Sequence, residues 1–172
     1  LKIERRAMAA KLWILTDVAS GKHEGDITIT SKDVGGAADG YSITKRTLRG
    51  GLTDGVEAIT VDNGKFSFVV LPTRGMSVWK AWLGDAEIGW QSPVRGPVHP
   101  KFVPLTEPSG LGWLDGFDEL LARCGLESNG APEFDEESGR LKYPLHGRIG
   151  NKPAHRVEVS VDGDSGEITV TG

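Results

Sequence analysis

Residues 57–71 read EAITVDNGKFSFVVL and predict two antiparallel strands joined by a tight turn. In the second run, Phe66 and Phe68 alternate with smaller side chains, which is the period of a half-buried strand. The turn is indicated by Asp62-Asn63-Gly64, because Asn and Gly tolerate the positive φ angles of a short hairpin loop. A β-hairpin is therefore the expected centre of this fold.

The alternating pattern continues on both sides of this hairpin. After a break at residues 72–75, the runs 76–83 and 86–90 complete a meander of four antiparallel strands. Further strands are expected at residues 26–31, 41–48, 156–161 and 167–171, the last two around the turn residues 162–166. Residues 11–19 are apolar and fit either a strand or a short helix.

One short helix is expected within the β-structure. Phe117, Leu120 and Leu121 have helical spacing, Asp115 is a suitable N-cap, and Gly125 is a suitable end. We therefore predict a helix over residues 115–124. The 24 glycines and 9 prolines are spread along the chain, which is typical of many turns between short strands. The predicted fold class is all-β, an antiparallel β-sandwich segment with one short helix.

Composition limits the function classes. The 172 residues suffice for one domain with a hydrophobic core, and the formal net charge of −4 argues against a nucleic-acid partner. No apolar run approaches the roughly 20 residues that cross a bilayer, so no membrane partner is expected. No signal peptide is visible, and the single cysteine excludes an internal disulfide. We expect a cytoplasmic protein in which Cys124 is a buried, inert thiol.

The candidate binding residues lie mostly in two loops, 110–130 and 143–148. Carboxylate, amide, imidazole and guanidinium groups beside aromatic rings are the mixture that a sugar pocket needs. The candidates for contact with a small sugar are His146, Arg74, Arg123, Asn129, Asp115, Arg148 and Trp113.

Each candidate also has a structural alternative. Trp113 could be a core residue, Asp115 could be a helix cap, and Arg123 could be an ion-pair partner. Asn129 and Arg74 could be turn residues. Asp118 and Glu119 could face solvent. The sequence lacks a phosphate-binding glycine loop, a dinucleotide motif and a zinc-binding cysteine pattern, so no cofactor and no metal are expected.

Several blocks of the sequence resemble a known superfamily. The segment Tyr143-Pro144-Leu145-His146-Gly147-Arg148 is similar to the Leu-His-Gly-Gly region of aldose 1-epimerases, which have the galactose-mutarotase-like fold. The DUF4432-type branch of that superfamily is similar over Arg74-Gly75-Met76, Gly89-Trp90-Gln91-Ser92-Pro93, Gly112-Trp113-Leu114-Asp115-Gly116-Phe117 and Arg123-Cys124-Gly125-Leu126-Glu127-Ser128-Asn129-Gly130. The resemblance runs from about Gly51 to the end of the chain.

The resemblance implies a large β-sandwich with a sugar site in a cleft. It implies that His146 helps to hold the sugar and its ring oxygen, whereas Arg148 replaces the second glycine of the family pattern. It places the catalytic Glu and second His well beyond the Leu-His-Gly block, so no catalytic residue is expected within this segment. The 172 residues would then form the N-terminal half of a longer chain.

Three functions stay open from the sequence. The parent protein could interconvert sugar anomers, the segment could be a sugar-binding module without chemistry, or all polar loops could be structural. An incomplete sandwich would also expose strand edges, so we expect the isolated segment to associate.

Overall fold

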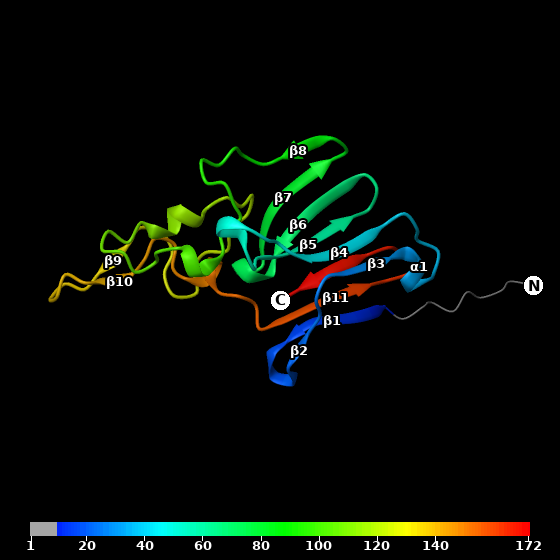
Figure 1. Ribbon diagram of the computed structural model, residues 1–172, viewed down its shortest axis with the longest axis horizontal. Coiled ribbons are helices and arrows are strands. Elements are labelled where there is room, and N and C mark those ends of the chain that lie inside the picture. Colours follow the sequence, from blue (N-terminus) through cyan, green and yellow to red (C-terminus); the bar gives the residue numbers. More distant parts are fainter. Residues whose placement is uncertain (1–9) are drawn as a thin grey trace, which may run out of the picture.

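The computed structural model describes residues 10–172 and contains two antiparallel sheets packed face to face (Figure 1). The first sheet has the order β12-β11-β1-β2. Its strands are β1 (Lys11–Asp17), β2 (Lys22–His23), β11 (Arg156–Val161) and β12 (Ile168–Thr171). Of the two alternatives for residues 11–19, the strand is therefore correct.

The second sheet is a six-stranded meander in sequence order, β3 to β8. Its strands are β3 (Ile27–Thr30), β4 (Ser42–Thr47), β5 (Glu57–Asp62), β6 (Phe66–Leu71), β7 (Ser77–Leu83) and β8 (Ala86–Ile88). The predicted meander of four strands is confirmed and is extended by β3 and β4. At the β5–β6 turn, Gly64 has φ 81° and Asn63 Oδ1 accepts a hydrogen bond of 2.8 Å from Phe66 N.

The core lies between the two sheets. Leu15, Val157, Val159 and Val161 come from the first sheet and pack against residues of the second, namely Ile29, Ile43, Ile59, Val61 and Val70. All of these side chains are buried, as the alternation along the strands predicts. The predicted antiparallel β-sandwich is confirmed.

The remaining elements are short and lie mostly outside this core. Strands β9 (Glu133–Phe134) and β10 (Leu141–Tyr143) form a separate hairpin. The helical turns are α1 (Ser31–Val34), η1 (Val18–Ser20), η2 (Gly51–Thr53), η3 (Pro72–Arg74), η4 (Pro100–Phe102), η5 (Gly112–Gly116) and η6 (Ile149–Asn151). The long connection between β8 and β11 therefore lies at one end of the sandwich as loops and single turns (Figure 1).

The helix predicted over residues 115–124 is wrong. Only the 3₁₀ turn η5 covers its start, and the chain then extends along β7. Leu120 N donates to Trp79 O at 2.9 Å, and Leu121 N and Val78 N each donate to the other residue's carbonyl at 3.0 Å. The helical spacing was overridden because these backbone groups pair with a sheet edge instead of with one another. The one α-helical turn in the described chain is α1.

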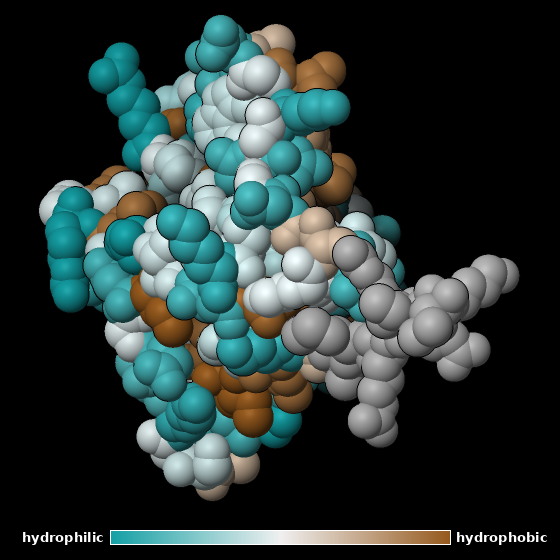
Figure 2. Space-filling model, turned by 90° about the vertical axis from the view of Figure 1, so that its right-hand side faces the viewer, coloured by the Kyte–Doolittle hydropathy of each residue, from teal (hydrophilic) through white to brown (hydrophobic). Residues whose placement is uncertain are grey.

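Part of the second sheet's inner face is uncovered. Phe66 lies opposite Leu83, and Ile88 lies opposite Ala81, so these side chains continue the face that carries the core residue Val70. Leu83 is 61% exposed and Ile88 is 42% exposed. Figure 2 shows hydrophobic surface at the upper margin of this end of the molecule, at the height of β7 and β8 in Figure 1. Contiguous apolar surface of this kind favours association.

Replacing both Leu83 and Ile88 by Gln should reduce self-association of the chain, because it removes exposed apolar surface without opening the core. We expect weaker binding of a hydrophobic dye and a smaller sedimentation coefficient at high protein concentration. The free energy of unfolding should change by no more than about 0.5 kcal/mol per site. The control is Val18→Gln, which alters an exposed residue on η1. Equal effects in the double variant and the control would contradict a role for this face.

Candidate functional site

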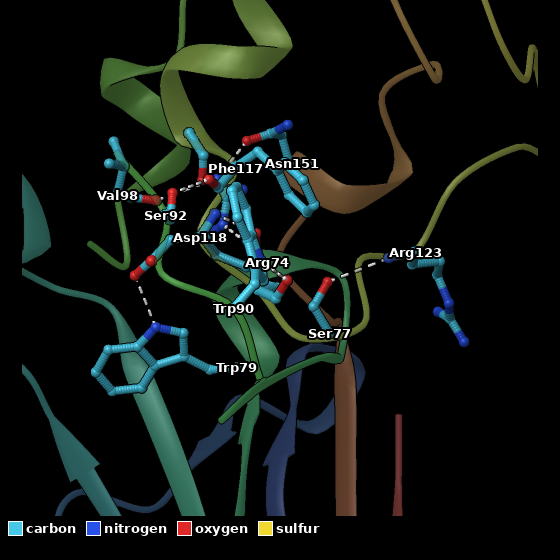
Figure 3. A network of polar contacts seen from close by, with 12 residues as sticks. Arg74, Ser77, Trp79, Trp90, Ser92, Val98, Phe117, Asp118, Arg123 and Asn151 are labelled. Carbon is cyan, nitrogen blue, oxygen red and sulfur yellow. Dashed lines mark hydrogen bonds and ion pairs between the residues drawn. The ribbon is translucent and has the colours of Figure 1, made fainter. Parts of the chain in front are cut away.

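Arg74 is the centre of a buried polar network (Figure 3). Its side chain is 1% exposed. The guanidinium donates four hydrogen bonds: Nε to Glu119 Oε1 at 2.5 Å, Nη1 to Asn151 Oδ1 at 2.6 Å and to Val98 O at 3.2 Å, and Nη2 to Gly116 O at 2.9 Å. These partners lie 24 to 77 residues away along the sequence. Arg74 therefore joins segments that no sheet connects.

Two glycines permit this close packing. Gly75 follows Arg74 with φ 62°, and a Cβ there would lie 2.3 Å from Ile149 O. A Cβ on Gly116 would lie 3.0 Å from Arg74 Nη1 and 2.7 Å from a methyl group of Val103. A larger residue at position 75 would push η3 and η6 apart, because a Cβ cannot approach a backbone carbonyl so closely, and a larger residue at position 116 would displace the Val103 and Arg74 side chains.

The network changes the interpretation of two predicted residues. Arg74 was expected to contact a sugar, but its guanidinium is enclosed by protein acceptors, so we assign it a positioning role. Glu119 was expected to face solvent, but it is 1% exposed and forms the buried ion pair with Arg74. Asn151 was not singled out by the sequence, because nothing in its neighbourhood indicates a partner 77 residues away.

Aromatic rings form a continuous row beside this network. Trp90 packs on Phe117 with ring centroids 4.9 Å apart, and Phe117 packs on Trp113 at 4.6 Å. Trp113 then meets the imidazole of His146 edge-on at 4.8 Å. The structure thus brings together Trp113 and His146, two of the predicted candidates, from loops that are far apart in the sequence.

His146 is held in an unusual backbone conformation. Its φ is 56°, and the following Gly147 has φ 72°. His146 N donates to Gly130 O at 2.9 Å, and Gly125 N donates to His146 O at 3.4 Å. A Cβ on Gly147 would lie 2.8 Å from Ser128 O. The two loops 125–130 and 144–148 therefore lie against each other, and a non-glycine residue with positive φ is a form of strain that accumulates at functional sites.

Three polar atoms around His146 and η6 are buried without a hydrogen-bond partner among the residues that the structure describes. They are Trp113 Nε1, His146 Nδ1 and Asn151 Nδ2. Burying an unpaired donor or acceptor costs about 1–3 kcal/mol. Native structures contain few such atoms, and a cluster of them calls for an explanation such as a ligand or catalytic role. This cluster is the candidate site.

The other predicted residues lie at different distances from this cluster. Asn129 is exposed between Ser128 and Gly130, next to the backbone that contacts His146. Arg148 forms an ion pair with Glu127 and donates from Nη2 to Lys142 O at 3.1 Å. Arg123 is exposed and points away from Arg74 (Figure 3). Asp115 is exposed and lines a separate hollow with Glu107 and Ser109.

Cys124 differs from its prediction. The thiol belongs to an exposed residue, although it was expected to be buried. Partial burial and the charge of Glu119 still raise the pKa of Cys124 above its ordinary value. A raised pKa lowers the thiolate fraction at neutral pH, so this cysteine is not arranged as a nucleophile.

Within residues 10–172 there is no cluster of three or more His, Cys, Asp or Glu side chains that could hold a metal ion. No helix in the same part of the chain is long and apolar enough to span a membrane.

Comparison with known proteins identified one family and one structural relative. The family model described as "Domain of unknown function (DUF4432)" matches residues 53–172. No curated protein sequence matches the chain significantly. A solved structure described as a "putative aldose 1-epimerase" from Klebsiella pneumoniae subsp. pneumoniae MGH 78578 is 37% identical, with a TM-score of 0.85. The match covers 94% of this chain, so this chain has an aldose 1-epimerase-like fold. It covers 42% of the solved protein, so this chain spans less than half the length of that protein.

The buried ion pair generates a stability prediction. Glu119→Gln should lower the free energy of unfolding by about 3–5 kcal/mol, because it leaves the buried Arg74 charge without a counter-charge. Urea denaturation at neutral pH measures the loss. The matched control is Glu167→Gln, which removes an exposed carboxylate beside β12 and should cost no more than about 0.5 kcal/mol. If both variants lose the same stability, the ion pair does not organise these loops.

Proposed function

This chain belongs to the DUF4432 family, and from that premise we propose that it is the sugar-binding part of an enzyme that interconverts sugar anomers without a redox cofactor. The observation that carries the proposal is the partly exposed His146 imidazole, which packs edge-on against Trp113 and is held in a loop with positive φ. The likeness to a solved structure described as a "putative aldose 1-epimerase" supports the same reaction class.

The pair has the chemical features that a sugar ring requires. An indole presents an apolar face to the C–H groups of a pyranose, and an imidazole nitrogen donates to or accepts from its oxygens. His146 is half-buried, so part of its ring is accessible while Nδ1 is enclosed. Trp113 is only 4% exposed, so its indole has little surface for a ligand and instead holds the imidazole in place from one side. We therefore assign His146 to ligand contact and Trp113 to its orientation.

Anomer interconversion needs two proton transfers. A base removes the proton from the anomeric hydroxyl, and an acid protonates the ring oxygen as the C1–O bond breaks. The open-chain aldehyde rotates about C1–C2 and closes again with the two protons returned. In this proposal His146 supports the ring oxygen, while the base and the acid come from the parent protein outside these 172 residues.

The other candidates surround the site. Asn129 is exposed beside Gly130, whose carbonyl accepts from His146 N, and we propose that its amide contacts a sugar hydroxyl; the ion pair of Arg148 with Glu127 forms the charged border of the site. Asp115 and Arg123 lie away from His146, so we propose that they contact only a ligand larger than one sugar ring. The proposed partner is a small sugar, with neither nucleic acid nor a membrane involved.

A second function is a sugar-binding module without catalysis. It requires only the contacts within this segment: the carboxylate of Glu127, in the loop beside His146, is paired with Arg148 and offers no free base there. An engaged carboxylate is a poor general base. Binding of sugar without acceleration of mutarotation by the full-length parent would select this function.

His146→Ala should weaken sugar binding by roughly tenfold or more, since a lost hydrogen bond to a ligand is worth about 1.4 kcal/mol. Titration calorimetry with α-D-galactose measures the affinity. His155→Ala is the control, because His155 is an exposed histidine at the start of β11. Unchanged affinity in His146→Ala, with normal folding by circular dichroism, would remove His146 from the site.

Polarimetry of freshly dissolved α-D-galactose then distinguishes the two functions. We expect no acceleration by the 172-residue chain alone and clear acceleration by its full-length parent. The same His146→Ala change in the parent should lower kcat/KM. A parent that binds galactose but leaves the optical rotation curve unchanged would be a binding module.

A further inference from the structure

A cavity lies at the Trp90 end of the aromatic row, away from His146. Its volume is about 420 Å³, and it opens between β7, the chain that follows β8 and residue 118. The lining side chains that matter are Trp79, Trp90, Ser92, Arg95, Lys80 and Asp118. None of the residues predicted to bind sugar lines this cavity.

The aromatic wall of the cavity is fixed before any ligand arrives. Trp90 is 42% exposed, yet its Nε1 donates to Glu119 O at 3.1 Å and its ring packs on Phe117. An exposed indole that is held in one orientation offers a fixed apolar contact for the C–H groups of a sugar, beside a lining that is mostly polar. Trp79 is held as well, because its Nε1 donates to Asp118 Oδ2 at 2.8 Å (Figure 3).

The loop that carries this wall is also internally braced. Ser92 Oγ donates to Phe117 O at 2.8 Å and accepts a hydrogen bond from Val94 N at 3.0 Å. These bonds attach the loop to the same segment that carries Phe117 and Asp118. The cavity is therefore a built concavity and not a gap beside a free loop.

The polar groups of the cavity have complementary capacities. The Asp118 carboxylate accepts from Trp79 and keeps further lone pairs for ligand hydroxyls. Burial raises its pKa above the ordinary value, as expected for a carboxylate set against tryptophan. Lys80 is neutralised by Glu87 at 2.8 Å, whereas Arg95 is exposed and has no hydrogen-bond or ion-pair partner among residues 10–172. An uncommitted guanidinium beside a sugar-sized cavity is suited to a carboxylate.

We propose that this cavity is a second carbohydrate site, specific for an acidic sugar. The pyranose ring packs beside Trp90, Asp118 accepts hydrogen bonds from ring hydroxyls, and Arg95 pairs with the sugar carboxylate. The site is independent of the proposed function at His146, because the two share no ligand-contacting residue. Phe117 and Trp113 lie between them, and both sites rest on the hydrogen-bond network of Arg74.

The test is titration calorimetry with D-glucuronate and, as the neutral match, D-glucose. We expect the wild-type chain to bind D-glucuronate more tightly than D-glucose. Arg95→Gln should weaken D-glucuronate roughly tenfold and remove this preference, since a charged pair at a partly open site contributes about 1.4 kcal/mol. The control Arg49→Gln changes another exposed arginine and should leave the affinity unchanged.

The His146→Ala chain separates this proposal from the proposed function. Retained D-glucuronate binding in His146→Ala, together with its loss in Arg95→Gln, supports a second site. Loss in His146→Ala with retention in Arg95→Gln places the ligand at His146 and overturns the second site while leaving the proposed function intact. Equal affinity for both sugars, or no binding of D-glucuronate, also overturns it.

Discussion

The guanidinium of Arg74 is the constraint on which the functional end of this molecule depends. A buried charge is costly unless it is paired and fully hydrogen-bonded, and Arg74 meets that condition with Glu119, Asn151 and two backbone carbonyls. The loops between β8 and β11 contain little regular structure that could hold them. Their positions are therefore set by long-range hydrogen bonds, those of Arg74 together with backbone bonds such as Leu120 N to Trp79 O and His146 N to Gly130 O.

Both candidate sites inherit their geometry from this network. Glu119, fixed by Arg74, accepts Trp90 Nε1 through its carbonyl and Asp118 N through Oε2, which orients the cavity at the Trp90 end of the aromatic row. On the other side, Asn151 holds η6 in place, and Gly150 in that turn lies close to the Trp113 indole. A single buried ion pair thus supports a contact region on each side without touching a ligand itself.

The sequence was sufficient to predict the strands of the sandwich but not the paths of the loops, for a physical reason. Alternation and turn residues are local signals, so the strands around Asp62-Asn63-Gly64 could be predicted residue by residue. The helix over residues 115–124 failed because its backbone groups pair with Val78 and Trp79, about 40 positions earlier. Glu119 and Asn151 were missed for the same reason, since their partner is Arg74.

The candidate residues themselves were only partly predictable. His146 and Trp113 could be found, because a histidine before glycine and an isolated tryptophan are visible in the sequence. Asp118 and Trp90 could not be joined into a cavity, since only the folded chain brings β7 and residue 118 together. The resemblance to sequence blocks of a known superfamily located the loops. It did not distinguish residues that position other side chains, such as Arg74, from residues that could bind a ligand.

Among the described residues, His146 combines positive φ with a buried, unpaired polar atom, and this combination supports a binding role. Unpaired atoms also occur at Thr16, Tyr41 and Glu57, and positive φ also occurs at the non-glycine residues Met76 and Leu126, but never both at one residue. His146 has positive φ, and its Nδ1 is unpartnered beside Trp113 Nε1 and Asn151 Nδ2. Each feature opposes folding by about 1–3 kcal/mol. The well-packed core between the two sheets supplies the stability that offsets this cost.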